Sequence, residues 1–351
     1  MTLYGKSATS TTESAQKRPT WMPAGTAHPL LAPAAIVSGT SAAVLWSLLS
    51  DDLTSIKIAS TVFMFVALAG AWNLLGGYAG YLNFGTVMFM GMGAYTTGIL
   101  STTFAVNPLL TLPFAAIVAG LGALLVGVPG FRLRGDYFAV ATFVLTLALQ
   151  QLAANIDITG GSTGLSVTSP MVSLESSVRL FCVLFLILGV CVTALNWGVE
   201  KTRWFSALTA IREDEDAAEV LGIPTLRIKL FAFVAGAAIA GVAGSMYASQ
   251  LQFIEPIGTF DFQVSLAVVV AVVLGGSGTW YGPVIGAVVT QLTLQLLLVN
   301  LDGIWNQIIF GALLVVGVLA APRGVAGLIR KARTRSQSTP TAVTGQDQRS
   351  N

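Results

Sequence analysis

Charged side chains are scarce in this sequence: Asp, Glu, Lys and Arg make up only 10% of its 351 residues. Soluble globular domains carry about 25% charged residues. A chain with so few cannot cover a surface that faces water, so its composition excludes an ordinary soluble fold. Hydrophobic residues make up 54% of the chain and the mean hydropathy is +0.77, which favours an integral membrane protein.

Histidine and cysteine are almost absent. The single histidine, His28, lies near the N-terminus, and Cys182 and Cys191 lie in one apolar segment. A helix would place these two cysteines about 13 Å apart along its axis, which is too far for a disulfide. With so few ligands and bases, we expect no catalytic residue, no metal site and no cofactor, and the protein is not expected to be an enzyme.

Two further absences concern the source of energy. No Lys, Arg, Asp or Glu lies near the middle of an expected membrane span, whereas proton- and sodium-driven carriers usually place an ionisable residue at that depth. The sequence also has no G-x-x-x-x-G-K-[ST] motif, and its nearest run, 130–136, ends in Asp136 where the phosphate-binding lysine would stand. We therefore expect no ATP site in this chain and a partner that supplies the energy.

Long apolar segments make up most of the chain and predict an all-α integral membrane protein with about ten transmembrane helices. Residues 1–29 and 322–351 predict disordered tails on either side of a transmembrane domain at 30–321, the second tail basic at first and then polar. The expected spans are 30–49, 56–76, 84–101, 109–129, 137–154, 178–197, 229–250, 264–281, 282–299 and 304–321.

Two uncharged glycine-rich breaks interrupt the apolar pattern, at 76–85 and 275–283. Each is either a tight hairpin or a re-entrant or discontinuous helix that is unwound inside the membrane. Unwound helices expose backbone groups that can contact a polar solute, although glycines also serve simply to let helices pack closely. The candidate pathway residues are Gly76, Gly77, Gly80, Tyr81, Asn83, Gly85, Thr86, Tyr95, Gly275, Gly276, Gly278 and Gly282.

The distribution of charge predicts the orientation, because Lys and Arg accumulate in cytoplasmic loops. If both termini lie in the cytoplasm, nearly all Lys and Arg residues fall on the cytoplasmic side. The exceptions are Lys57 and Arg179, at the outer ends of spans. The inner segments then contain Lys6, Lys17, Arg18, Arg132, Arg134, Lys201, Arg203, Arg212, Arg227 and Arg323.

The loop at 200–228 is the most charged part of the chain and predicts a short amphipathic helix from Ser206 to Gly222. Its expected apolar stripe consists of Leu208, Ile211, Ala218 and Leu221. An amphipathic helix that faces the cytosol must bury such a stripe against something.

Within this loop, Asp216, Ala217, Ala218 and Gly222 match E-A-A-x-x-x-G, the cytoplasmic signature of ABC importer permeases, with Asp in place of Glu. Further blocks resemble the branched-chain amino-acid permeases of these importers (LivM type), in the family's order. They are AWNLLGGYAG at 71–80, GMGAY at 91–95, RLRGDYFA at 132–139, TGGSTG at 159–164, AIREDE at 210–215, KLFAF at 229–233, LGGSGT at 274–279 and GPVIGA at 282–287.

The resemblance implies a permease subunit that forms half of a translocation pathway for branched-chain or other hydrophobic amino acids in a bacterial inner membrane. Its implied partners are a second, homologous permease, two cytoplasmic ATP-binding subunits, an extracytoplasmic solute-binding protein and the lipid bilayer, without nucleic acid. The residues that would couple it to the ATPases are Arg212, Glu215, Asp216, Ala217, Ala218, Leu221 and Gly222.

Three alternatives remain open at this stage. Thr86 stands where the family commonly has histidine, so the same architecture could carry urea, short amides or another class of amino acid. A passive channel would need no coupling helix, and a secondary carrier would need an ionisable residue inside the membrane.

Overall fold

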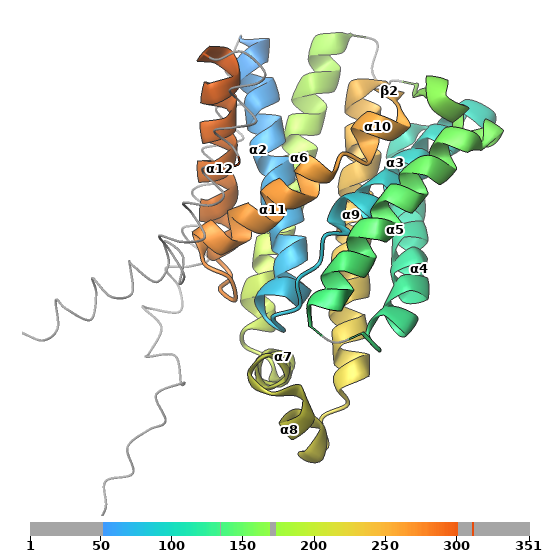
Figure 1. Ribbon diagram of the computed structural model, residues 1–351. Coiled ribbons are helices and arrows are strands. Elements are labelled where there is room, and N and C mark those ends of the chain that lie inside the picture. The colour runs from blue at the N-terminus through green and yellow to red at the C-terminus, as the bar shows by residue number, and fades with distance from the viewer. Residues whose placement is uncertain (1–51, 134, 169–172, 301–310, 312–351) are drawn as a thin grey trace, which may run out of the picture.

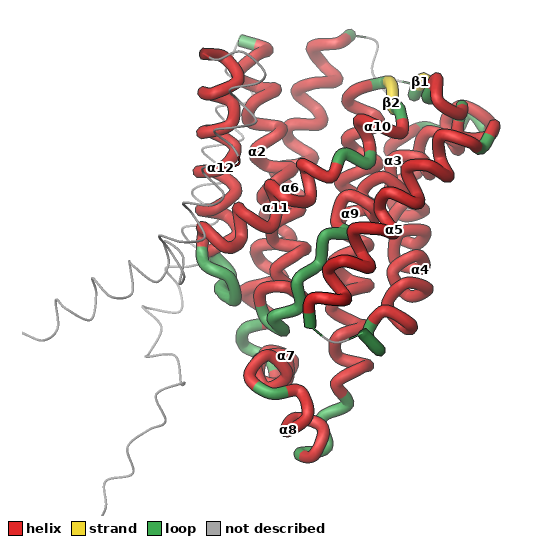
Figure 2. The backbone as a smooth tube through the Cα atoms, in the orientation of Figure 1, coloured by secondary structure: helices red, strands yellow, loops and turns green. Residues whose placement is uncertain are grey.

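The structure is a computed structural model that describes residues 52–133, 135–168, 173–300 and 311. Figures 1 and 2 show a bundle of helices with almost no other regular structure in these residues. The only strands described, β1 (Leu165–Ser166) and β2 (Phe253–Ile254), form a short antiparallel pair at the end of the bundle opposite α7 and α8. The helices are α2 (Leu53–Trp72), α3 (Thr86–Thr103), α4 (Leu112–Gly130), α5 (Asp136–Asn155), α6 (Leu174–Val199), α7 (Arg203–Glu213), α8 (Glu215–Val220), α9 (Thr225–Leu251), α10 (Pro256–Thr259), α11 (Phe262–Gly275) and α12 (Gly282–Asn300).

Six helical segments in the described residues are long and apolar enough to cross a membrane. They are Leu53–Gly77, Pro108–Gly130, Asp136–Asn155, Glu175–Val199, Thr225–Leu251 and Pro256–Gly275. Every expected span between 56 and 299 overlaps a helix, whereas the expected spans 30–49 and 304–321, like the two expected tails, lie outside the described residues. The span expected over 264–281 is too long, because α11 ends at Gly275.

Helix α9 lies in the centre of the bundle and packs closely against α3 and α4. Small residues make this approach possible. A Cβ atom on Gly93 would lie 2.0 Å from the carbonyl oxygen of Gly241, and one on Gly244 would lie 1.8 Å from that of Met90. Lipid tails are as apolar as the helix surfaces, so helices in a membrane associate through such close packing rather than through the hydrophobic effect.

A second group of helices consists of α2, α6 and α12, and α11 runs obliquely across the bundle in Figure 1. Buried amides join α2 to α6: the side chain of Asn196 donates to the carbonyl of Gly70 at 3.0 Å and accepts from Asn73 Nδ2 at 3.0 Å. Helix α2 also packs against α9 and so connects the two groups.

The charged loop forms two helices rather than the single helix expected from Ser206 to Gly222. Asp214 takes an extended conformation, with φ −160°, and its carboxylate accepts from the backbone N–H of Ala217 at 3.0 Å. This N-cap ends α7 and begins α8. Ser206 therefore lies inside α7, whereas Gly222, with φ +81°, follows the end of α8 as expected.

Candidate functional site

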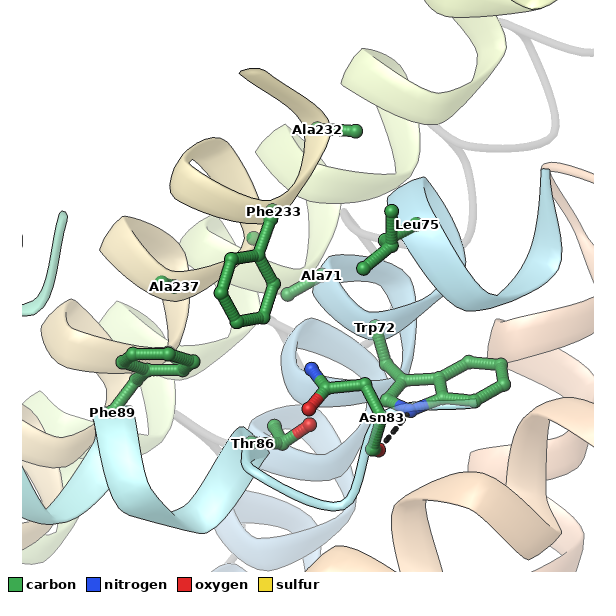
Figure 3. A pocket seen from close by; sticks show the side chains of 11 residues that line it. Ala71, Trp72, Leu75, Asn83, Thr86, Phe89, Ala232, Phe233 and Ala237 are labelled. Carbon is green, nitrogen blue, oxygen red and sulfur yellow. Dashed lines mark hydrogen bonds between the residues drawn. The ribbon is translucent and has the colours of Figure 1, made fainter. Parts of the chain in front are cut away.

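The first glycine-rich break is an unwound helix rather than a tight hairpin. Helix α2 continues into a π-helical turn at Asn73–Gly77, after which the chain contains no helix until α3 begins at Thr86. In Figure 2 this non-helical segment, residues 78–85, runs between α11 and α5. Tyr78, Ala79 and Asn83 are buried in it, whereas Gly80 and Leu82 are exposed. The indole Nε1 of Trp72 donates to the carbonyl of Asn83 at 2.7 Å and holds the segment against α2 (Figure 3).

The second break is a tight hairpin between α11 and α12. A Cβ atom on Gly275 would lie 1.9 Å from the carbonyl oxygen of Gly282, so the two helices meet at a distance that only glycine permits. Gly276 and Gly278 have φ values of +115° and +78°, which glycine adopts without the steric penalty of a side chain.

The two breaks meet at Asn73, which is fully buried. Its side-chain oxygen accepts from the backbone N–H of Gly278 at 3.1 Å, and its Nδ2 donates to Asn196 and, at 3.3 Å, to the carbonyl of Thr279. One amide thus joins the π-helical turn, α6 and the α11–α12 hairpin.

A small cavity lies between α2, the unwound segment, α3 and α9 (Figure 3). Trp72, Asn83 and Thr86 form its polar side, and the rings of Phe89 and Phe233 form its apolar side. The space holds about one water molecule, far less than an amino acid needs. Any solute that passes at this point requires the surrounding elements to separate.

The inner side of the charged loop contacts the first break at two points, at the end of the π-helical turn and within the unwound segment 78–85. Arg212 Nη1 donates to the carbonyl of Gly77 at 2.9 Å, and the carboxylate of Glu215 accepts from the hydroxyl of Tyr81. Glu215 also forms an ion pair with Lys229 of α9. Gly80, with φ +76°, lies directly beneath the side chain of Arg212.

The outer side of the loop is exposed and partly apolar. Val220 and Leu221 are 88% and 79% exposed, and Asp216 and Ala217 are exposed beside them. Of the expected stripe, Leu208, Ile211 and Ala218 are buried in the core of the membrane helices, whereas Leu221 lies apart from them on the exposed side. One face of the loop therefore packs against the helix bundle, and the other faces solution.

Comparison with known proteins identifies the class to which this arrangement belongs. The sequence model of the family described as "Branched-chain amino acid transport system / permease component" matches residues 53–318. The chain belongs to this family. It is a multi-pass membrane permease component, a transport protein rather than an enzyme.

Several curated permeases are similar to it. The high-affinity branched-chain amino acid transport system permease protein LivM of Escherichia coli is 29% identical over 316 residues, which cover 82% of this chain and 73% of that protein. LivM of Salmonella typhimurium is 29% identical over 79% of this chain and 71% of that protein. The autoinducer 2 import system permease protein LsrC of Yersinia pseudotuberculosis is 29% identical over 64% of this chain and 66% of that protein. No solved structure matches the chain.

The remaining candidate pathway residues of the permease lie at different distances from the cavity. Gly76 and Gly85 pack next to it, against Trp72 and Asn83. Tyr95 does not: its ring stacks on Phe260, with centroids 5.7 Å apart, in a separate apolar cluster. The glycines of the second break form the hairpin and approach the first break only around Gly278.

Several residues of this site were not among the sequence-based candidates, among them Asn73, Lys229 and Glu200. Glu200 follows α6 and lies 3.4 Å from the hydroxyl of Tyr78, at the start of the unwound segment. Burial raises the pKa of its carboxyl to about 7, although hydrogen bonds from the backbone of Trp280 and from Tyr78 oppose the shift. Asn73 stands inside an apolar run, where a buried amide needs hydrogen-bond partners, and this is a signal that could have found it.

Proposed function

We propose that the protein is the permease subunit of an ATP-binding-cassette importer for branched-chain or other hydrophobic amino acids. It would form half of the pathway beside a homologous permease, with two cytoplasmic ATPases and an extracytoplasmic solute-binding protein. This assignment includes ten spans, cytoplasmic termini, a bacterial inner membrane and no ATP site of its own. Family membership and the similarity to LivM support it.

One structural observation carries the mechanism: the charged loop presents Val220 and Leu221 to solution while its other side bonds to the first break. Arg212 bonds to Gly77 and Glu215 bonds to Tyr81. An ATPase that buries the apolar tip would move α8. The movement would reach residues 78–85, where Asn83 lines the cavity. Such a route connects ATP binding to the separation of elements that the small cavity requires.

The similarity to LsrC supports a second candidate, the same machine with a different small solute. Polar Thr86 in the cavity wall is compatible with this. In importers of this kind the soluble receptor selects most of the cargo, so the two candidates share one mechanism and differ only in the loaded receptor.

The test is ATP-dependent uptake of radiolabelled leucine into vesicles that contain the permease with its neighbouring permease, ATPases and binding protein. We expect Leu221→Glu to weaken ATPase docking by roughly 10- to 100-fold, the equivalent of the about 1.5–3 kcal/mol gained when a leucine side chain is buried. Leu221→Met, which keeps an apolar side chain of similar volume, is the matched control and should dock normally.

Uptake that requires ATP in the wild type and is lost in Leu221→Glu supports both the importer function and the docking of the exposed residue Leu221 on an ATPase. Leucine uptake that is indifferent to ATP contradicts the proposal and favours a channel. ATP hydrolysis stimulated by a different loaded receptor, without leucine uptake, supports the second candidate.

A further inference from the structure

We propose that Lys229 is a positioning residue that ties the unwound segment to α8, so that movement of the loop is passed directly to the cavity wall. The inference rests on the proposed importer function. The group of Lys229, Glu215 and Tyr81 is called the Lys229 cluster below.

The Lys229 cluster joins three separate parts of the chain. The ammonium of Lys229, on α9, forms an ion pair with Glu215 on α8 and lies 3.0 Å from the hydroxyl oxygen of Tyr81 in the unwound segment. That hydroxyl also bonds to the second oxygen of the Glu215 carboxylate. Each of the three polar groups therefore contacts the other two.

Burial makes this arrangement costly to break. The side chain of Lys229 is only 2% exposed, whereas that of Glu215 is 25% exposed. The ammonium also lies over two aromatic rings, 4.6 Å from the centroid of Tyr81 and 5.3 Å from that of Phe131. A buried charge that loses its counter-charge pays a large desolvation penalty, so displacement of Glu215 favours movement of Lys229 and Tyr81 with it.

A displacement of Tyr81 reaches the cavity over a short distance. Asn83 lies two residues further along non-helical backbone, lines the cavity and accepts the indole hydrogen bond of Trp72. The loop also holds the end of the π-helical turn, where Arg212 bonds to the carbonyl of Gly77. The loop thus bonds to the residue before the segment and to Tyr81 within it, and Trp72 of α2 holds the segment at Asn83, beside the cavity.

The experiment measures leucine imported per ATP hydrolysed by the full transporter, reconstituted in liposomes with leucine-loaded binding protein. The variants are Lys229→Met, Glu215→Gln and the double substitution. Glu213→Gln, an exposed carboxylate on the same loop, is the matched control. We expect each single variant to lower the ratio by about tenfold or more, because a buried pair is broken, and the double variant to lower it no further, because both act through one interaction.

A purely structural role would lower uptake and ATP hydrolysis together and leave their ratio unchanged, which would overturn the proposal. Independent losses that multiply in the double variant would also overturn it.

A second measurement does not depend on transport. Hydrogen exchange of the purified permease should be faster at backbone amides 78–82 in Glu215→Gln and Lys229→Met, and unchanged in Glu213→Gln. If the wild type shows no ATP-dependent leucine uptake, the proposed function fails and exchange alone decides the inference. Equal exchange in wild type and variants refutes it.

Discussion

Asn73 offers a sharp test of how the two breaks are held together, because its side chain satisfies three partners at once. In Asn73→Ala, Asn196 Oδ1, the N–H of Gly278 and the carbonyl of Thr279 each lose a hydrogen bond. Asn196 cannot turn to compensate, since its Nδ2 is already bonded to the carbonyls of Gly70 and Val192.

The expected cost follows from the burial of each group. The oxygen of Asn196 is fully buried and costs about 1–3 kcal/mol when unpaired. The groups of Gly278 and Thr279 are partly buried, where water can replace the lost bond and the cost is about 0.5–1 kcal/mol each. Asn73→Ala should therefore lower the free energy of unfolding by roughly 2–5 kcal/mol in total.

Thermal unfolding in detergent measures this loss. Asn155→Ala is the control, because that exposed amide donates only to Gln151 in its own helix, and its removal should change stability by no more than about 0.5 kcal/mol. An Asn73→Ala protein as stable as the Asn155→Ala protein would refute the view that this amide joins the breaks.

Two further predictions concern packing and pH. Gly244→Ala needs about 1.6 Å of additional room between α3 and α9 to bring its Cβ from 1.8 Å to ordinary contact at 3.4 Å. It should destabilise the protein by about 1–3 kcal/mol, despite the higher helix propensity of alanine. Gly198→Ala, which meets nothing within 4 Å, should not lower the melting temperature, and equal melting temperatures for the two variants would contradict the argument. The pKa of Glu200 is raised from 4.5 to about 7, so between these values the folded protein holds a proton that the unfolded chain has lost. Stability should fall as pH rises from about 5 to about 8, and Glu200→Gln should flatten this dependence in a melting experiment; an unchanged slope would show that Glu200 is not its source.

The membrane helices and the positions of the breaks could be predicted because they depend on local composition. Apolar runs give the spans, and the glycines at 76–80 and 275–278 interrupt them. Sequence alone could not distinguish an unwound helix from a hairpin. That difference depends on distant partners, such as the indole of Trp72 for the first break and the contact of Gly275 with Gly282 for the second.

The charged loop at 200–228 shows where a periodic pattern misleads. The stripe from Leu208 to Leu221 assumes one continuous helix, but the N-cap at Asp214 begins a new helix that ends at Val220, before Leu221. Ala218 remains on the buried side, and Leu221 is turned to solution. An aspartate can cap a helix and so mark its start, and Asp214 does so in the middle of a charged run. A search for apolar periodicity does not detect this signal.

The contacts that join the loop to the bundle were beyond sequence reasoning for a different reason. Lys229 is 148 residues from Tyr81, and Asn73 is 205 residues from Gly278. Only the fold brings such residues together. In the sequence, Lys229 stands only in the block KLFAF, and nothing there shows that it is buried and therefore needs a partner.

The position of the charges in the described spans has an electrical consequence. Lys57, Arg179 and Lys229 lie near helix ends, and the middle of each described span contains no charged side chain. A full elementary charge moved across a membrane at 100 mV changes the free energy by about 2.3 kcal/mol. When the described helices rearrange, they would move almost no charge across the membrane, so their equilibrium would depend little on the membrane potential. In this part of the subunit, the rearrangement would therefore depend on ATP rather than on the membrane potential.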